Sequence, residues 1–162
     1  MRYMNGIDAL DRIDFGILVA LRKDARISNK ELAALVQLAP SSCLERVRRL
    51  RSSGALRGFH ADVDPEALGI GLEALISVRI QRHSRDQLEQ FQAHVLSLPE
   101  TTHVYHVAGA NDFLVHVQVR DAAHLRDLAL DSFTTRPEVE HMETNLIFSH
   151  RQSYLLPRES DA

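Results

Sequence analysis

The sequence predicts an α+β protein with a winged-helix-like helix-turn-helix domain followed by a ferredoxin-like βαββαβ domain. Two observations lead to this fold class. Two short helices separated by a tight break are predicted between residues 29 and 56. A strand–helix–strand pattern then occurs twice between residues 73 and 148. We expect the first domain at residues 1–60, a linker at 61–71 and the second domain at 72–162.

Helix-capping residues mark the first two helices. Asp11 is a suitable N-cap for a helix over residues 11–24, whose apolar residues recur at helical spacing. Ser28 is a suitable N-cap for the second helix, and Glu31 follows three residues later, which is the spacing of a capping box. Both helices should therefore begin where these caps lie.

The third helix is the one expected to contact a partner. Pro40 suits its first position because the missing N–H costs nothing there, and Gly54 suits a left-handed C-terminal residue. At roughly 100° per residue, a narrow apolar stripe faces the domain core, namely Cys43, Val47 and Leu50. Short polar and basic side chains face away from it, with Arg46 on the flank: Ser41, Ser42, Glu45, Arg48, Arg49 and Ser52. Such a helix, packed on a preceding one, is how helix-turn-helix motifs enter a major groove.

Charge is divided unevenly along the chain. Residues 1–60 hold 11 Lys and Arg against 6 Asp and Glu, a net charge of +5, whereas residues 61–162 hold 8 against 16, a net charge of −8. The first part can contact phosphates and the second would be repelled by them. We therefore favour double-stranded DNA binding over a merely solvated arginine face. The basic face should make about 6–8 phosphate contacts per dimer, for a log–log salt slope of about −5 to −7.

The second domain is predicted from alternating strands and amphipathic helices. The two repeats have nearly equal spacing, because residues 78–99 span 21 positions and residues 117–137 span 20. Strands are expected over residues 73–82, 102–108, 113–119 and 139–148, with helices over residues 85–98 and 122–133. Both helices should cover one face of the sheet. The other face carries Leu75, Leu114 and His116, and is too apolar to stay bare, so we expect a homodimer through it.

The linker and the turn between the repeats have simple local interpretations. Loose alternation over residues 55–64 predicts an extended linker strand, and residues 65–71 a turn or helical hinge. The turn formed by Gly109, Ala110, Asn111 and Asp112 suits an ordinary hairpin. Alternatively, Asp112 offers a carboxylate to the ammonium group of an amine or amino acid.

Several further patterns leave alternatives or exclude function classes. Glu45 either accepts from a cytosine amino group or pairs with an arginine one turn on. The single Cys43 is either a small buried hydrophobe or a redox sensor, and its lack of a disulfide partner favours the cytoplasm.

Nine histidines show no compact ligand spacing, so we expect no metal and no cofactor. No apolar run approaches the roughly 20 residues that span a bilayer, and no catalytic order stands out, so we expect neither a membrane nor an enzyme.

The chain resembles the Lrp/AsnC family, the feast/famine regulators, over almost its whole length. The G-x-x-D-[YF] turn of that family is similar to residues 109–113. The other resembling motifs lie in the first domain: Leu10–Asp11–Arg12–Ile13–Asp14, Arg26–Ile27–Ser28–Asn29, Glu31–Leu32–Ala33, Pro40, Cys43–Leu44–Glu45–Arg46–Val47–Arg48–Arg49–Leu50, Gly54 and Gly58–Phe59.

The resemblance implies a cytoplasmic, DNA-binding transcriptional regulator that senses a small molecule, usually an amino acid. It implies dimerisation through the second domain, with dimers often assembling into octamers. By position, the effector would contact Gly109, Ala110, Asn111 and Asp112, together with Thr144 on the last strand. Two alternatives are a DNA-architectural protein without an effector, and an enzyme similar to the sirohaem decarboxylases, which share both domains.

Two residues depart from the family pattern in the helix-turn-helix. Gln37 stands where the family usually has Gly, so either Gln37 accepts an unusual φ or the turn is altered. Ala39 stands where the family usually has Ser, so a cap on the third helix should be lost, at a cost of about 1 kcal/mol.

Overall fold

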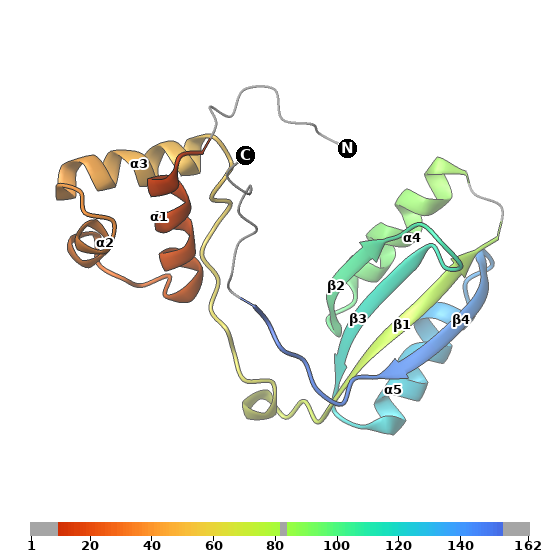
Figure 1. Cartoon of the computed structure of the whole chain (residues 1–162). Coiled ribbons are helices and arrows are strands. Elements are labelled where there is room, and N and C mark those ends of the chain that lie inside the picture. The colour runs from red at the N-terminus through yellow and green to blue at the C-terminus, as the bar shows by residue number, and fades with distance from the viewer. Residues whose placement is uncertain (1–9, 82–83, 154–162) are drawn as a thin grey trace. The chain divides into compact units, whose positions relative to one another are not determined.

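A computed structural model of the chain describes residues 10–81 and 84–153. The chain folds as two compact units (Figure 1). Of the described residues, the first unit comprises residues 10–62 with residues 151–153, and the second comprises residues 63–81 and 84–150. Each unit is described by itself below.

Three helices form the described part of the first unit. They are α1 (Arg12–Lys23), α2 (Asn29–Leu35) and α3 (Pro40–Ser52) (Figure 1). The small apolar core between them consists of Ile17, Leu21, Leu32, Ala33, Cys43 and Leu50. The helix-turn-helix predicted from the sequence is confirmed, and the buried stripe of α3 is the one expected.

The predicted caps of α1 and α2 are confirmed. The Asp11 carboxylate accepts the Asp14 N–H at 2.8 Å, and the Asp14 carboxylate in turn accepts the Asp11 N–H at 3.2 Å. The Ser28 hydroxyl accepts the Glu31 N–H at 3.2 Å, and Glu31 accepts the Ser28 N–H at 3.1 Å. Both are reciprocal capping boxes, which satisfy N–H groups that a helix start leaves without partners.

The turn between α2 and α3 takes the unusual backbone conformation. Gln37 has φ 57°, the left-handed region that favours glycine. Ala39 occupies the N-cap of α3 and provides no side-chain hydrogen bond, as predicted. The Asn29 amide at the start of α2 instead donates to the Pro40 carbonyl at 2.8 Å, and so joins the starts of the two helices.

The prediction of a linker strand over residues 55–64 is wrong. These residues form no β-ladder, and the side chains of Phe59 and Val63 are 44% and 53% exposed. The alternation has no neighbouring strand to pair with, so it produces no sheet. The helical hinge that follows is confirmed as the 3₁₀ helix η1 (Glu66–Leu68), which Gly69 ends with φ 74°.

The second unit is a four-stranded antiparallel sheet with the order β2-β3-β1-β4. Its helices cover one face of the sheet (Figure 1). The elements are β1 (Leu72–Ile80), α4 (Arg85–Ser97), β2 (Thr101–His106), β3 (Phe113–Val119), α5 (Ala122–Ala129), the π-helical turn η2 (Leu130–Thr134) and β4 (Val139–Leu146). This is the predicted βαββαβ arrangement, and the last predicted helix differs only in ending as a π-helical turn.

Alternation along the strands places the core of this unit on the helix-covered face. Ala74, Ile76, Val78 and Ile80 of β1 and Phe113, Val115, Val117 and Val119 of β3 are all buried, as predicted. Helix residues complete the core, namely Phe91, Val95, Leu125, Leu128 and Phe133. The Phe91 ring contacts those of Phe113 and Phe133, with centroids 5.0 Å and 6.3 Å away. In the described residues, no helix is long and apolar enough to cross a membrane.

Candidate functional site

The outward face of α3 presents the short polar side chains that the sequence predicted. Ser41, Ser42, Glu45 and Arg48 are all exposed, while Cys43 and Leu50 on the opposite face are buried. Pro40 starts the helix, so the two serines stand in its first turn. Side chains at the start of a recognition helix are those that reach base edges. The face is thus open to a large partner.

Two arginines of α3 are held by α1 instead of extending outward. Arg46 Nη1 donates to Asp14 Oδ1 at 2.9 Å and to Asp11 Oδ2 at 2.6 Å. Arg49 Nη2 donates to Asp14 Oδ2 at 2.6 Å. The Asp14 side chain is only 1% exposed, whereas those of Arg46 and Arg49 are 26% and 51% exposed. We call these four residues the Asp–Arg cluster.

The charges of the Asp–Arg cluster support one another. The pKa of Asp11 is lowered, first by the hydrogen bond from the Asp14 N–H and then by the one from Arg46. The pKa of Arg46 is raised, first by its hydrogen bond to Asp11 and then by the one to Asp14. The ionised forms of Asp11 and Arg46 are therefore favoured, and their ion pair ties α3 to the start of α1.

The structure bears on the two α3 residues for which the sequence left two roles open, Glu45 and Cys43. In the described part of the chain, Glu45 forms no ion pair with Arg48 or Arg49. Glu45 is exposed, as Ser41 and Ser42 are. Cys43 is fully buried, and burial raises the pKa of its thiol. A protonated, inaccessible thiol is a poor redox sensor, which favours the packing role.

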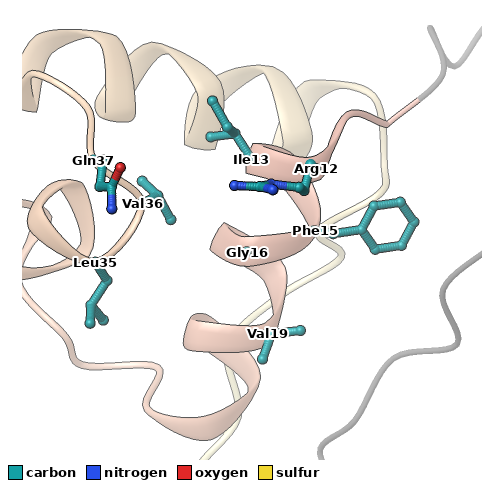
Figure 2. Close-up of a pocket in the computed structure, with 8 residues that line it drawn as sticks. All are labelled: Arg12, Ile13, Phe15, Gly16, Val19, Leu35, Val36 and Gln37. Carbon is teal, nitrogen blue, oxygen red and sulfur yellow. The ribbon is translucent and has the colours of Figure 1, made fainter. Parts of the chain in front are cut away.

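A hollow of about 360 Å³ lies between α1 and the end of α2 (Figure 2). Gly16 lies in its floor, and a Cβ at this position would stand 3.3 Å from Val36 Cγ1, so the two helices approach closely there. The lining residues are Arg12, Ile13, Phe15, Gly16, Val19, Leu35, Val36 and Gln37. None of them belongs to α3, so the hollow is separate from the outward face described above.

The turn between β2 and β3 is a hairpin whose last residue extends the sheet. Gly109 has φ 141°, a conformation in which a side chain would be strained. The Asp112 N–H donates to the Val78 carbonyl at 2.9 Å, and the Ile80 N–H donates to Asp112 Oδ2 at 2.8 Å. The Asp112 carboxylate thus replaces a backbone carbonyl at the point where β3 leaves β1.

The sequence had offered two interpretations of this turn, an ordinary hairpin or a site where Asp112 binds an ammonium group. The structure shows a third arrangement, because the capped amide belongs to β1, 32 positions earlier in the chain.

A guanidinium group lies beside the same turn. Arg79 Nε donates to the Ala110 carbonyl at 2.8 Å, and the Arg79 side chain is exposed. Thr144, by contrast, pairs with Ile76 and lies on the opposite face of the sheet from Arg79, which pairs with His141. The structure therefore brings Arg79 to the turn and does not bring Thr144 there.

A second concave region of this unit is polar. It has a volume of about 690 Å³ and lies between α4 and the segment from η2 to β4. Its lining residues are Gln81, Gln87, Gln90, His94, Asp131, Thr135, Arg136, Pro137 and Glu138. None of residues 109–112 lines it. Over residues 10–81 and 84–153, no three His, Cys, Asp or Glu side chains form a group that could hold a metal ion.

Two protein-family models match the chain, one in each unit. The AsnC-type helix-turn-helix domain matches residues 10–51. The Lrp/AsnC ligand binding domain matches residues 73–154, about half of the chain. The chain belongs to the Lrp/AsnC family.

Individual relatives of this Lrp/AsnC chain are transcriptional regulators. The HTH-type transcriptional regulator AldR of Mycolicibacterium smegmatis is 45% identical over 141 residues, which cover 87% of this chain and 82% of the relative. The leucine-responsive regulatory protein of Escherichia coli is 38% identical over 138 residues, which cover 85% and 84%. The chain is therefore a transcriptional regulator with a DNA-binding helix-turn-helix and a ligand-binding domain, not an enzyme.

Solved structures of Lrp/AsnC proteins have the same fold. A transcriptional regulator of Neisseria meningitidis in complex with L-Met aligns with a TM-score of 0.85 at 31% identity, covering 92% of this chain and 97% of that one. E. coli AsnC aligns with a TM-score of 0.79 at 26% identity, covering 91% and 100%.

Sequence reasoning missed three contributors to these sites. Asp11 and Asp14 were recognised only as a cap and as part of a motif, and their pairing with α3 spans 32 to 35 positions. Arg79 belongs to the residues of β1 that face away from the core, since it lies between the buried Val78 and Ile80. That alternation was visible in the sequence, but the approach of Ala110 from another strand was not.

Proposed function

We propose that this Lrp/AsnC regulator reads a specific double-stranded DNA sequence in the cytoplasm with the outward face of α3. We propose further that an amino acid, bound at the turn of residues 109–112, tunes its affinity for the operator. The observation that supports the effector class most directly is the pair of opposite charges at this turn. Asp112 and Arg79 both form hydrogen bonds there, to Ile80 N–H and to the Ala110 carbonyl.

The DNA-binding part rests on the outward face of α3. Serine hydroxyls accept or donate to several bases, a glutamate accepts from the cytosine amino group, and an arginine suits either guanine or phosphate. Ser41, Ser42, Glu45 and Arg48 present this set on one exposed helix. The same face predicts that Arg48 contributes affinity, and the serines and Glu45 contribute sequence preference.

The effector part rests on the chemistry of a free amino acid. Its ammonium group suits the Asp112 carboxylate, and its carboxylate suits the Arg79 guanidinium, since charge-assisted hydrogen bonds are the stronger ones. Backbone groups at Gly109, Ala110 and Asn111 would bind the same atoms in any α-amino acid. A turn of this kind leaves the choice of side chain to its surroundings.

The experiment is an effector titration on an operator that the protein itself selects from random duplex DNA. A thermal-shift screen of the twenty amino acids identifies the ligand to be titrated. Asp112→Asn keeps an oxygen that can accept the Ile80 N–H and removes only the charge. We expect it to raise the midpoint of the effector response about 10- to 150-fold, which corresponds to the loss of about 1.5–3 kcal/mol.

Matched variants make this result specific. Asp127→Asn removes an exposed carboxylate on α5 that pairs with neighbouring Arg126, and should leave the midpoint in place. Arg79→Gln should weaken the response as Asp112→Asn does. If Asp112→Asn lowers the melting temperature but leaves the midpoint unshifted, Asp112 is structural and the turn is not the sensing site.

Two other outcomes favour the alternatives. If Asp131→Asn shifts the midpoint and Asp112→Asn does not, the effector binds in the polar cleft beside η2 instead. If no amino acid changes either the melting temperature or the operator affinity, the protein acts on DNA without an effector, as an architectural protein would.

We also propose that the protein is a homodimer through the uncovered face of its sheet, with higher assembly up to an octamer. The helices cover the other face, and the uncovered one carries the half-buried Leu75 and Leu114 beside Tyr105, which is 50% exposed. Apolar surface of this kind is typical of an interaction site.

Sedimentation of the full-length chain tests the interface. Leu114→Asp should convert the dimer to a monomer at micromolar concentration, because a charge would be buried without a partner. Leu96→Asp is the matched control, since Leu96 lies on α4 and is 57% exposed. An unchanged dimer for Leu114→Asp would place the interface elsewhere.

A further inference from the structure

We propose that Asp14 is a positioning residue that withholds the charges of Arg46 and Arg49 from DNA phosphates. The inference rests on the proposed DNA binding by α3. The arginines on the basic face of this helix then have two different roles. Arg48 remains available to DNA, while Arg46 and Arg49 hold α3 at its angle to α1.

The geometry of the Asp–Arg cluster carries the first step. Asp14 uses both carboxylate oxygens, one toward Arg46 at 2.9 Å and one toward Arg49 at 2.6 Å. Asp11 adds a second acceptor for Arg46 at 2.6 Å. Each contact has the short distance of a charge-assisted hydrogen bond.

Burial makes these contacts hard to exchange for contacts with DNA. The Asp14 side chain is 1% exposed with both arginines in place, so an arginine that leaves takes away a charge-assisted hydrogen bond from a buried carboxylate. A buried carboxylate without its partner is strongly unfavourable. A phosphate would therefore have to compete with the ion pairs within the protein, whereas Arg48 is exposed and forms no ion pair in the described residues.

Charge balance carries the second step. Helix α3 contains four arginines and Glu45, a net charge of +3. Asp11 and Asp14 of the cluster lower this to +1. Counterion release depends on how many phosphates the protein neutralises, and an arginine whose charge is already balanced contributes little to it. Two arginines per subunit therefore no longer count among the phosphate contacts. We expect a salt slope of about −2 to −4 for the dimer instead of about −5 to −7.

The consequence for recognition is a gain in selectivity at the expense of general affinity. Phosphate contacts bind every sequence, while base contacts distinguish one sequence from another. A helix that keeps two of its arginines in the protein depends more on Ser41, Ser42 and Glu45. Releasing the arginines should raise affinity for unrelated DNA more than for the operator.

The experiment measures binding of the full-length protein to its selected operator and to an unrelated duplex of equal length, over a range of salt concentrations. Arg48→Gln should make the log–log slope shallower by about two per dimer. Arg49→Gln and Arg46→Gln should leave the slope unchanged and lower the melting temperature. Asp14→Asn should steepen the slope and reduce the ratio of operator to unrelated affinity at least several-fold.

A double variant separates released charge from general damage. In Asp14→Asn with Arg49→Gln, the slope should be about two per dimer less steep than in Asp14→Asn alone, because Arg49 is the arginine that the aspartate change releases while Asp11 still holds Arg46. A melting curve checks that each variant is folded. If Asp14→Asn does not fold, the two single arginine variants decide the question by themselves.

The outcome that overturns the proposal is a slope for Arg49→Gln as shallow as that for Arg48→Gln. Both arginines would then contact phosphates despite the ion pairs. Failure of the proposed function looks different, since the wild-type protein would then select no operator and show no salt-dependent binding.

Discussion

Each of the two units of this protein is stabilised internally by a different kind of contact. The first has a core of six buried apolar residues and, among its described residues, a buried aspartate engaged by two arginines. The described residues of the second include thirteen buried apolar ones in one continuous cluster. Because the core of the first unit is small, we expect the charged contacts between α1 and α3 to contribute a larger share of its stability. The stability of the first unit should therefore respond to charge, and that of the second to packing.

Truncation of a core ring should have the largest effect and should fall on the second unit. Phe91 is fully buried against Phe113 and Phe133. Phe91→Ala should lower the free energy of unfolding of this unit by about 3–5 kcal/mol, because it removes apolar contacts and leaves a cavity. Denaturant unfolding, followed with probes in each unit, measures it. An equal loss in the first unit would show that the two do not unfold separately.

Removal of one arginine should come next and should fall on the first unit. Arg46→Ala breaks two charge-assisted hydrogen bonds at a partly buried site and should cost about 1–3 kcal/mol. Arg126→Ala is the control, because Arg126 forms an exposed pair with Asp127 that contributes about 0–1 kcal/mol. Urea titration compares the two variants. Equal, small losses would mean that the Asp–Arg cluster does not hold α3.

Acid should weaken the first unit through Asp11. Its folded-state pKa lies below the ordinary value of 3.8 because of the Asp14 N–H and Arg46. The stabilisation is therefore fully present above the unfolded pKa and is lost as the pH falls through the folded pKa. Melting curves of wild type and Asp11→Asn should differ at neutral pH and converge as the pH falls below about 4. A constant difference down to pH 2 would contradict this assignment.

Restoring a helix cap should have the smallest effect and the opposite sign. Ala39→Ser offers a hydroxyl to the free N–H groups at the start of α3 and should stabilise the first unit by about 1 kcal/mol. Ala34→Ser is the control, because this exposed residue lies inside α2, where serine has a lower helix propensity than alanine. No gain for Ala39→Ser would indicate that the Asn29 contact with Pro40 already stabilises this start.

Local chemistry is what the sequence predicted best. The capping boxes of α1 and α2 join residues three positions apart, and the alternation of β1 and β3 is visible within each strand. The left-handed conformation of Gln37 was one of two expected outcomes, because the family usually has glycine at this position.

Contacts between distant residues could not be predicted in the same way. On a helical wheel Arg46 lies on the flank and Arg49 faces outward, yet both side chains reach an aspartate 32 and 35 positions earlier. Residues 55–64 alternate like a strand, but a strand forms only beside a second strand with which it can pair. Whether a second strand lies there depends on the whole fold. The turn of residues 109–112 was predicted from its composition, while the approach of Arg79 to this turn depended on how the strands pair.

The hydrogen bond from Ile80 to Asp112 makes one amide proton of β1 a natural reporter. Because the acceptor is a side chain beyond the end of β3, protection of the Ile80 amide against deuterium exchange depends on where that carboxylate lies. An amino acid that engages Asp112 at the proposed site would draw the acceptor away or fix it more firmly. Either change alters the exchange rate of a single amide at the end of a central strand, so a bound effector would be registered within the sheet itself.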